Sequence, residues 1–391
     1  MEQAITKMPH PIITETHLEF GRKVREFAER ELAPHADEWE EKEEFPSSIF
    51  SRFAELGFLG LRFPKEYAGQ NLDLIHSVVL SEQLAHSTMG GITMAVSVEN
   101  EMVAPPIFRF GSEEQKQRFL VPMNRGLKIG ALGITEPNAG SDVAAIQTRA
   151  KKGNGHWILN GEKIFITNGC RADFVLVLAR TSPEKGYRGM SLFLVETDSP
   201  GFTRRKLHKI TMRCSDTAQL FFDDCCIPFQ NLLGDEGQGF YHIMWELQGE
   251  RLAGAANAIG RGQMAFEAAL KYAQERVQFG QRLADFQAIR HKLADMATQL
   301  EVTRQFVYYV AWLFENGQYP VKEISMAKLM ASQVSCKVAE EALQIHGGQG
   351  LLTSNPVQRY WHDTRLSRIG GGTDEIQREV IARTLIPKAE K

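Results

Sequence analysis

The 391-residue sequence lacks a basic excess, a long apolar run and a paired set of cysteines, and each absence excludes a class of protein. Its 45 lysines and arginines are offset by 48 acids, a formal net charge of −3, so it has no basic surface for nucleic acid or anionic membranes. The longest unbroken apolar run, Phe306 to Phe314, falls far short of the ~20 residues that a spanning helix needs. We therefore expect no nucleic-acid partner and no membrane span.

The first residues and the cysteines both indicate a reducing compartment. The segment MEQAITKMPH has an acid at position 2 and no basic stretch followed by an apolar one, so we expect a cytoplasmic protein rather than a secreted or imported one. The cysteines are odd in number and form no CxxC pair, and the 11 histidines show no ligand spacing. We expect no metal site, and free thiols at Cys170, Cys214, Cys225, Cys226 and Cys336.

The first region of the chain, about residues 15–120, has a helical pattern. Apolar residues recur at helical spacing between Leu18 and Leu32, and Pro34 is expected to end that helix. Further helices are expected to begin after Ser47 and Asp73.

Residues 127–231 contain short apolar runs rich in β-formers, separated by Gly, Pro, Asn and Asp. Asn160-Gly161, between WIL and EKIFIT, is the strongest local signal for a β-hairpin, because both residues accept a positive φ. Several strands at near-regular spacing predict a small antiparallel barrel or sandwich rather than a parallel α/β sheet.

Helical periodicity returns after residue 238. Apolar residues seven apart predict a long helix with one stripe facing another helix, at Leu293, Leu300, Val307 and Phe314. A second helix, roughly Ile324 to His346, should end at Gly347. A third should begin after the glycines at 370–372, with Thr373 as its N-cap.

These patterns predict an α+β protein that is mainly α. At ~150 residues per domain the length allows two or three domains. We expect three: an all-helical domain at 1–125, a β-domain at 126–235 and a helical bundle domain at 236–391.

Dedicated phosphate and metal motifs are absent, since the sequence has no GxGxxG after a strand, no P-loop, no HExxH and no GxSxG. Four unusual segments remain, at residues 133–142, 245–252, 343–350 and 370–377. Taken singly, each is explained by ordinary structure: a loop, helix caps or a solvated charge pair. Their glycines would also let a ligand approach the backbone closely. His346, at a helix end, is expected to cap or pack.

Together, these segments resemble the flavin-dependent acyl-CoA dehydrogenases. GITEPNAGSDVAA and QIHGGQGLLTSNPVQRYWHD are similar to the two signatures of that family, and NGEKIFITNG, SDTAQLFFDD, ERVQFGQRLADFQAI and GGTDEIQREVIARTL are further matches in the same order. The resemblance covers about residues 15–386. It implies an N-terminal helical domain, a middle β-domain, a C-terminal four-helix bundle, FAD as cofactor and a homotetramer built as a dimer of dimers.

By that resemblance, FAD lies between the β-domain and the C-terminal helices. The residues that would meet the flavin ring are Leu132, Ile134, Thr135, Ser141, Phe165 and Thr167, with Phe165 where many relatives have Trp. Arg276 and Phe279 of a neighbouring subunit would reach the pyrophosphate and adenine end, with Phe286 and Gln287 nearby. The same end of FAD would be met by Gln344, Gly347 and Gly348, and the site completed by Thr373 and Glu375.

The implied reaction removes an α-proton from an acyl-CoA while the β-hydride passes to the flavin, giving a trans-2-enoyl-CoA. It needs a carboxylate base in a water-poor cleft. Many relatives carry this glutamate just before the Gly-Thr of the terminal motif, where this sequence has Gly371. In the long-chain and isovaleryl branches the base precedes an Arg-Leu pair on a helix, and GERL places Glu250 there. We expect Glu250 to be the base, with the N–H of Gly371 polarising the thioester oxygen.

The resemblance also implies partners. The residues matching substrate contacts are Ser141, Gln248, Arg251 and Gly372, and the implied electron acceptor is an electron-transfer flavoprotein. Two alternatives stay open: an acyl-CoA oxidase or flavin monooxygenase on the same fold, and a catalytically silent flavin or acyl-carrier binding protein, to which Gly371 points. Local similarity favours long acyl chains, while the position of the base keeps branched chains open.

Overall fold

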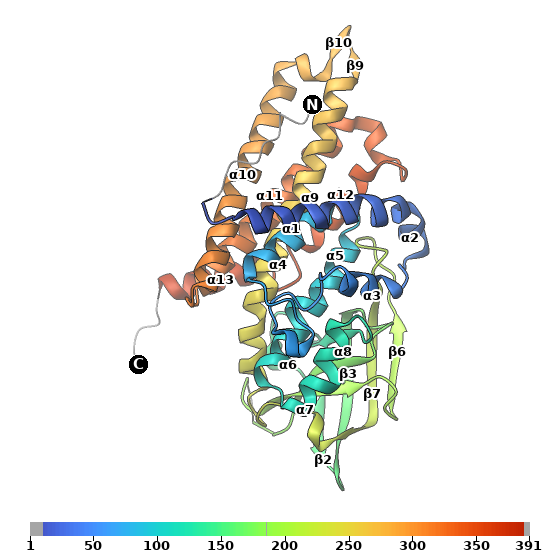
Figure 1. Ribbon diagram of the computed structural model, residues 1–391, viewed down its shortest axis with the longest axis vertical. Helices are drawn as coiled ribbons and strands as arrows, with labels where there is room; N and C mark the ends of the chain where they lie inside the picture. Colours follow the sequence, from blue (N-terminus) through green and yellow to red (C-terminus); the bar gives the residue numbers. More distant parts are fainter. Residues whose placement is uncertain (1–10, 185, 387–391) are drawn as a thin grey trace.

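The computed structural model describes residues 11–184 and 186–386, and its elements run in the order helices, sheet, helices (Figure 1). The segment 1–10, on which the expected location rests, lies outside the described residues. Among these described residues, no helix is both long enough and apolar enough to cross a membrane. All five cysteines are free, as predicted.

The helical path at the N-terminus continues through Pro34. α1 (Glu15–Phe27) passes into a π-helical turn, η2 (Ala28–Leu32), then a 3-10 turn, η3 (Ala33–His35), and then α2 (Ala36–Lys42). Pro34 lies among the first residues of η3, where a missing N–H is tolerated, so the chain bends and stays helical. The prediction that Pro34 ends the segment is therefore wrong.

Two further helices of this region begin at the predicted polar residues. α3 (Ser48–Glu55) follows Ser47, and α4 (Leu74–Gln83) follows Asp73, whose carboxylate accepts the backbone N–H of His76 at 3.0 Å. The remaining elements are η4 (Lys65–Tyr67), η5 (Leu84–Ser87), α5 (Gly90–Ser97), η6 (Val98–Val103), α6 (Ala104–Phe110), α7 (Glu113–Gln115), η7 (Lys116–Leu120) and α8 (Val121–Asn124).

The middle region is an eight-stranded sheet with the strand order β6-β7-β3-β2-β4-β5-β8 and β1 beside β4. Pairing is antiparallel, except that β1 and one residue pair of β2 run parallel to β4. The sheet folds back on itself, which brings Trp157 of β3 edge-on against Phe193 of β5 with ring centroids 5.3 Å apart. Its elements are β1 (Gly130–Gly133), η8 (Val143–Ala145), β2 (Arg149–Lys152), β3 (His156–Thr167), β4 (Phe174–Arg180), β5 (Met190–Glu196), β6 (Phe202–Lys206), β7 (Thr217–Pro228), η9 (Phe229–Asn231) and β8 (Leu232–Leu233).

The predicted hairpin at Asn160-Gly161 does not form, because β3 runs straight through both residues. The register against β7 shifts between Leu159 and Gly161, so the glycine marks a β-bulge instead of a turn. Asn160 is tied to Asp224 of β7 by two hydrogen bonds of 3.0 Å, one from the Asn160 side-chain amide and one from the Asp224 backbone N–H. The turn that joins β2 to β3 lies at residues 153–155.

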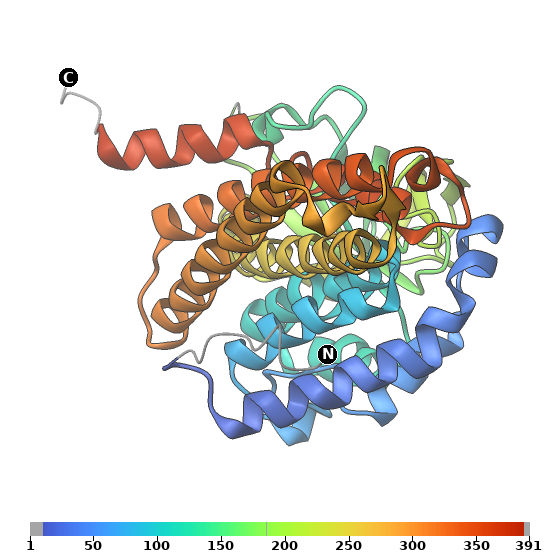
Figure 2. The ribbon, with the colours of Figure 1, turned by 90° about the horizontal axis from the view of Figure 1, so that it is seen from above.

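The C-terminal region is built on long helices that lie side by side in Figure 2: α9 (Gly239–Glu275), α10 (Gln287–Glu315) and α11 (Val321–His346). The predicted stripe of α10 is buried at Leu293, Leu300 and Val307, whereas Phe314 is half-buried near the helix end. α11 ends at Gly347 as predicted, with a left-handed φ of 58°.

The chain ends in a helix that begins as predicted. The hydroxyl of Thr373 accepts the backbone N–H of Ile376 at 3.3 Å and so caps α13. α13 extends away from the bundle in Figure 2. The other elements of this region are β9 (Val277–Gln278), β10 (Gln281–Arg282), η10 (Leu283–Asp285), η11 (Gly347–Leu351), α12 (Pro356–Leu366) and α13 (Asp374–Leu385).

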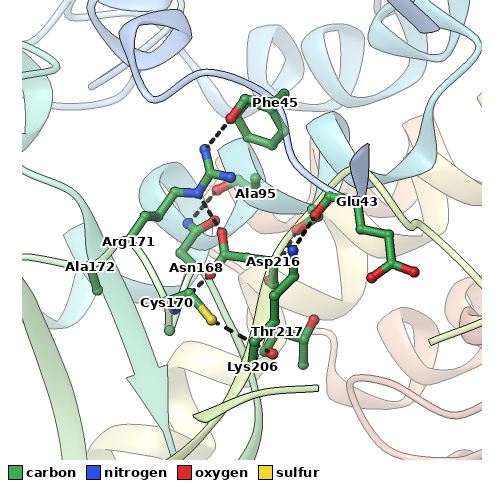
Figure 3. A network of polar contacts seen from close by, with 12 residues as sticks. Glu43, Phe45, Ala95, Asn168, Cys170, Arg171, Ala172, Lys206, Asp216 and Thr217 are labelled. Atoms are coloured by element: carbon green, nitrogen blue, oxygen red, sulfur yellow. Dashed lines mark hydrogen bonds and ion pairs between the residues drawn. The ribbon is translucent and has the colours of Figure 1, made fainter. Parts of the chain in front are cut away.

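A polar network holds the end of β3 against the N-terminal helices (Figure 3). The side-chain amide of Asn168 donates to the carbonyl of Ala95 at 3.1 Å. Arg171 forms an ion pair with Asp216 and donates to the carbonyl of Phe45 at 2.9 Å, with its guanidinium 4.1 Å from the centre of that ring. This network fixes the strand that carries two of the predicted flavin contacts.

Candidate active site

The structure places Glu250 of α9 beside the glycine turn that precedes α13. A Cβ built on Gly371 would lie 3.3 Å from Oε1 of Glu250. Position 371, where many relatives carry the base, and Glu250, its predicted replacement, therefore face the same small volume. Glu250 keeps partial exposure, which a base that must reach a substrate requires.

The glycine turn is held rigidly by side chains from three helices. Arg251 donates through Nε to the carbonyl of Gly371 at 3.1 Å, and Lys328 donates to the carbonyl of Gly372 at 2.6 Å. The amide of Gln377 donates to both carbonyls at 3.1 Å. The φ angles of 65° at Gly371 and 92° at Gly372 lie in the left-handed region, which explains the glycines.

Burial controls the protonation of the carboxyl groups at this site. It raises the pKa of Glu250, and the positive charges of Arg251 and Lys328 offset part of that rise. The pKa of Lys328 is lowered to about 8, chiefly by burial. A carboxylate poised in this way can take a proton from a carbon acid in a cleft that holds little water.

Lys163 of β3 positions the loop that follows β1. Its ammonium group, 0% exposed, donates to the carbonyl of Ile134 at 2.9 Å and to Glu136 at 2.8 Å. Burial lowers the pKa of Lys163 to about 8 despite the opposing charge of Glu136. The backbone N–H of Ile164 donates to the carbonyl of Thr135 at 2.9 Å, which joins the loop to β3.

Phe165 presents its ring to the surface at the same place. It is 67% exposed and has a left-handed φ of 62°. Leu132, Ile134, Thr135 and Thr167 are half-buried, and Ser141 is exposed. An uncovered aromatic ring with apolar and hydroxyl side chains around it fits the ring system of a flavin.

The residues predicted for the adenine end of FAD lie around the hairpin of β9 and β10, at the end of the long helices that points away from the sheet (Figure 1). Arg276 is exposed and Phe279 is 95% exposed, with its ring edge-on to Phe286 at 6.3 Å. His346 packs on Tyr272 with ring centroids 4.4 Å apart, as a packing role predicts, so the end of α11 lies beside the end of α9. The remaining predicted residues here, all exposed, are Gln287, Gln344, Gly347 and Gly348.

A single chain thus brings the flavin-ring residues together, and separately the adenine-end residues, but it does not join the two groups. Around Gly347 and Gly348 a built Cβ would meet no atom within 4 Å, so both leave the backbone open to a ligand. The uncovered ring of Phe165 fits the flavin half of FAD, and the open backbone at Gly347 and Gly348, with the exposed Arg276, fits the adenine and pyrophosphate half. Glu375, also in the predicted set, is exposed in the first turn of α13.

The predicted substrate residues divide between buried and exposed positions. Gln248 is 4% exposed, and its side-chain amide donates to the carbonyl of Met244 at 2.9 Å. Arg251 is 7% exposed and is engaged with the glycine turn, so it lies under the site instead of facing solvent. Ser141 is exposed on the loop after β1.

Two features of this neighbourhood were not predicted. Glu246, one helical turn before Glu250, is 2% exposed, and the Arg62–Glu101 ion pair closes at 2.7 Å nearby. The i, i+4 spacing of Glu246 and Glu250 in the sequence indicates that the two carboxyl groups lie on the same face of α9. The Arg62–Glu101 ion pair joins residues far apart in sequence, so no local sequence pattern predicts it.

Away from this site, His17, Asp73 and His76 gather where no metal site was expected, with ligand atoms within 4.8 Å of one another. Asp73 bonds His17 Nε2 at 2.9 Å and His76 Nδ1 at 2.7 Å, and so ties α1 to α4. These hydrogen bonds explain the cluster as a structural tie.

Comparison with known proteins gives one consistent result. Family models match the N-terminal, middle and C-terminal domains of acyl-CoA dehydrogenase over residues 14–127, 131–225 and 237–386. An acyl-CoA dehydrogenase of Bacillus subtilis is 39% identical over 375 residues, covering 96% of this chain and 99% of that protein. The long-chain specific mitochondrial enzyme of Sus scrofa is 40% identical over 378 residues, covering 96% and 87%. The short-chain specific mitochondrial enzyme of Rattus norvegicus is 40% identical over 376 residues, covering 96% and 91%.

Solved structures share the fold over nearly the whole chain. Butyryl-CoA dehydrogenase from Megasphaera elsdenii has a TM-score of 0.92 at 38% identity, covering 95% of this chain and 98% of its own. A chain in a structure described as the electron transferring flavoprotein of Acidaminococcus fermentans has a TM-score of 0.93 at 39% identity, covering 96% and 99%. Glutaryl-CoA dehydrogenase from Mycobacterium smegmatis in complex with FADH2 has a TM-score of 0.91 at 29% identity, covering 97% and 96%.

Proposed function

The chain belongs to the acyl-CoA dehydrogenase family, and from that premise we propose that it oxidises the Cα–Cβ bond of an acyl-CoA thioester with Glu250 as the base. The α-proton passes to the Glu250 carboxylate, the β-hydrogen leaves with its electron pair, and a trans-2-enoyl-CoA remains. FAD, which this family uses, supplies the hydride acceptor.

The observation that carries the proposal is the juxtaposition of Glu250 and Gly371. Only 3.3 Å separates the Glu250 carboxylate from the place where a side chain at 371 would start. A carboxylate from α9 can therefore serve the position that a glutamate at 371 would otherwise serve. Because Gly371 has no side chain, its backbone is also close enough to the site to act as an oxyanion-type donor.

Replacement of the proposed base gives a direct test. The Glu250→Gln holoenzyme, mixed anaerobically with a saturated acyl-CoA, should lose its flavin absorbance at least ~100-fold more slowly than the wild type. Glu267→Gln on the same helix is the matched control, because Glu267 lies more than four helical turns farther along α9 and accepts a hydrogen bond from Gln263 at 2.9 Å. Bleaching of Glu250→Gln at the wild-type rate would rule out this base. A wild-type holoenzyme that binds thioesters without bleaching would instead be a silent binding protein.

Electron transfer to an electron-transfer flavoprotein is part of the same proposal. The similarity to the Acidaminococcus fermentans chain supports it. Turnover should depend on added electron-transfer flavoprotein. Rapid hydrogen peroxide formation in air without that protein would indicate an oxidase instead.

The long-chain and short-chain specific relatives are each 40% identical to this chain, so sequence identity favours neither acyl chain length. A panel of acyl-CoA thioesters of increasing length and branching, scored by anaerobic flavin bleaching, would define the substrate class.

A homotetramer is proposed as the working assembly. The flavin-ring residues lie on β1, on β3 and on the loop after β1, whereas the adenine-end residues lie around the β9–β10 hairpin, so the proposal requires a second subunit to complete the FAD site. Val302, Tyr309 and Trp312 on α10 are also exposed, at 66%, 45% and 39%, as expected of a helix that packs against another copy. Sedimentation of the holoenzyme tests the assembly.

A further inference from the structure

Glu246 has an environment that folding alone does not explain. It lies on α9 one turn before Glu250 and is 2% exposed, yet neither of its carboxyl oxygens finds a hydrogen-bond partner among the described residues. Leaving a buried polar group unpaired destabilises a protein, and native proteins do so rarely. Such a group beside a proposed base points to a partner that arrives with the substrate.

The surroundings of Glu246 form a polar wall. Glu101 of η6 is 3% exposed and pairs with Arg62 at 2.7 Å. A Cβ built on Gly249 would lie 3.9 Å from both the Arg62 guanidinium and the Glu101 carboxylate, so α9 approaches this wall without an intervening side chain. A plain hydrocarbon chain could satisfy none of these groups.

The protonation state of Glu246 narrows the chemistry of its partner. Burial, together with the negative charges of Glu250 and Glu101, raises its pKa well above the usual range, and Arg251 offsets this only in part. A neutral carboxylic acid has one O–H to donate and a carbonyl oxygen to accept. The matching partner is a neutral group that also donates and accepts, and a hydroxyl is the simplest.

We propose that Glu246 recognises a hydroxyl group on the acyl chain, so that this enzyme prefers hydroxyacyl-CoA thioesters to unsubstituted ones of the same length. The inference rests on the proposed function, since it takes Glu250 to mark the α-carbon. Four residues of helix rise by ~6 Å, which an extended chain spans in roughly five bonds. A hydroxyl at the end of a six-carbon acyl group is therefore a suitable probe.

The test compares 6-hydroxyhexanoyl-CoA with hexanoyl-CoA. Dissociation constants are measured from the perturbation of the flavin spectrum in the Glu250→Gln holoenzyme, where turnover is slow. We expect the hydroxylated thioester to bind at least ~10-fold more tightly. With Glu246→Leu added, 6-hydroxyhexanoyl-CoA should bind no more tightly than hexanoyl-CoA, because an apolar side chain of similar size favours the unsubstituted acyl chain. Adding Glu246→Gln, which still donates and accepts, should preserve the preference.

Equal binding of the two thioesters would overturn the inference, as would a preference that survives Glu246→Leu. Loss of the preference in Glu246→Gln would overturn the assignment of a neutral hydroxyl. A second measurement, flavin bleaching of the wild-type holoenzyme by each thioester, distinguishes failure of this inference from failure of the proposed function. If both bleach the flavin without discrimination, only the inference fails; if they bind with discrimination and neither bleaches it, only the proposed function fails.

Discussion

Two acidic clusters of the helical regions, one around Glu82 and Arg304 and the other around Glu246 and Glu250, differ in how well their carboxyl groups are paired. Glu82 of α4, 3% exposed, accepts a hydrogen bond from Arg304 at 3.0 Å and one from the Tyr308 hydroxyl at 2.7 Å. Glu246 of α9 is equally buried and lacks any hydrogen-bond partner in the described part of the chain. Full pairing of a buried charge is expected where it serves the fold alone, whereas an unpaired group signals a role that the fold does not complete.

The same contrast extends to Glu250. Glu82 is fixed by Arg304, which also donates to Gln263 at 2.7 Å, so the cluster ties α4, α9 and α10 together. Among the described residues, no hydrogen bond or ion pair holds the Glu250 carboxylate, and Arg251 and Lys328, whose charges lower its pKa, donate their hydrogen bonds to the glycine turn. The free carboxylate is available to a substrate, and the two clusters should respond oppositely to substitution.

The largest expected effect separates rate from stability at Glu250. Glu250→Gln should slow anaerobic flavin reduction by about 100- to 10,000-fold, because the base is lost. The unfolding midpoint should stay the same or rise, since a partly buried acid with a raised pKa is replaced by a neutral amide. Stopped-flow spectroscopy and thermal unfolding of the same holoenzyme preparation measure both quantities. A large loss of stability would place Glu250 with the structural cluster instead.

The second effect is the converse, a loss of stability at the paired cluster. Arg304→Met leaves the Glu82 carboxyl buried without its cation and should lower the free energy of unfolding by about 3–5 kcal/mol. Urea unfolding measures it. Arg52→Met is the matched control, because Arg52 pairs with Glu31 at the surface, where the two side chains are 40% and 44% exposed, and its loss of stability should be far smaller than that of Arg304→Met. Equal losses in the two variants would remove the distinction between paired and unpaired clusters.

The third effect concerns the pH dependence of stability. The folded-state pKa of Glu246 is raised, so the folded protein binds a proton that the unfolded chain has released. Stability should therefore fall as pH rises from the unfolded pKa toward the folded one, by about 1.4 kcal/mol per pH unit from this group. Glu246→Gln should flatten this slope, with the largest gain in stability at the upper end of the window. Unfolding free energies of both proteins from pH 5 to 8 test the sign.

Much of the fold follows from the sequence because helix caps and apolar periodicity are local. Thr373 and Asp73 cap helices as expected, and the stripe of α10 is buried where its spacing predicts. The hairpin predicted at Asn160 does not form, because Asn160 forms two hydrogen bonds with Asp224, a residue distant in sequence, and stays within a continuous strand. Pro34 fails as a stop because η3 tolerates a proline near its start.

The candidate site divides in the same way. Glu250 could be predicted because it lies next to a motif, whereas the isolation of Glu246 could not. Its burial depends on how α9 packs against η6, where Glu101 is already paired with Arg62. No local pattern states which buried carboxyl will find a partner, because partners are assigned by the tertiary structure.

The smallest effect compares Gly371, beside the Glu250 carboxylate, with Gly254, one helical turn after Glu250 in α9. Gly371 has a φ of 65°, and a Cβ there would crowd the Glu250 carboxylate at 3.3 Å, so Gly371→Ala should lower the free energy of unfolding by about 1 kcal/mol. Gly254 lies inside α9, where a Cβ would meet no atom within 4 Å, so Gly254→Ala should raise that free energy by about 0.5–1 kcal/mol. Chemical unfolding of the two variants measures effects of opposite sign. A higher free energy of unfolding in both variants would mean that the turn accommodates a side chain at 371, and that the nearness of Glu250 does not require glycine there.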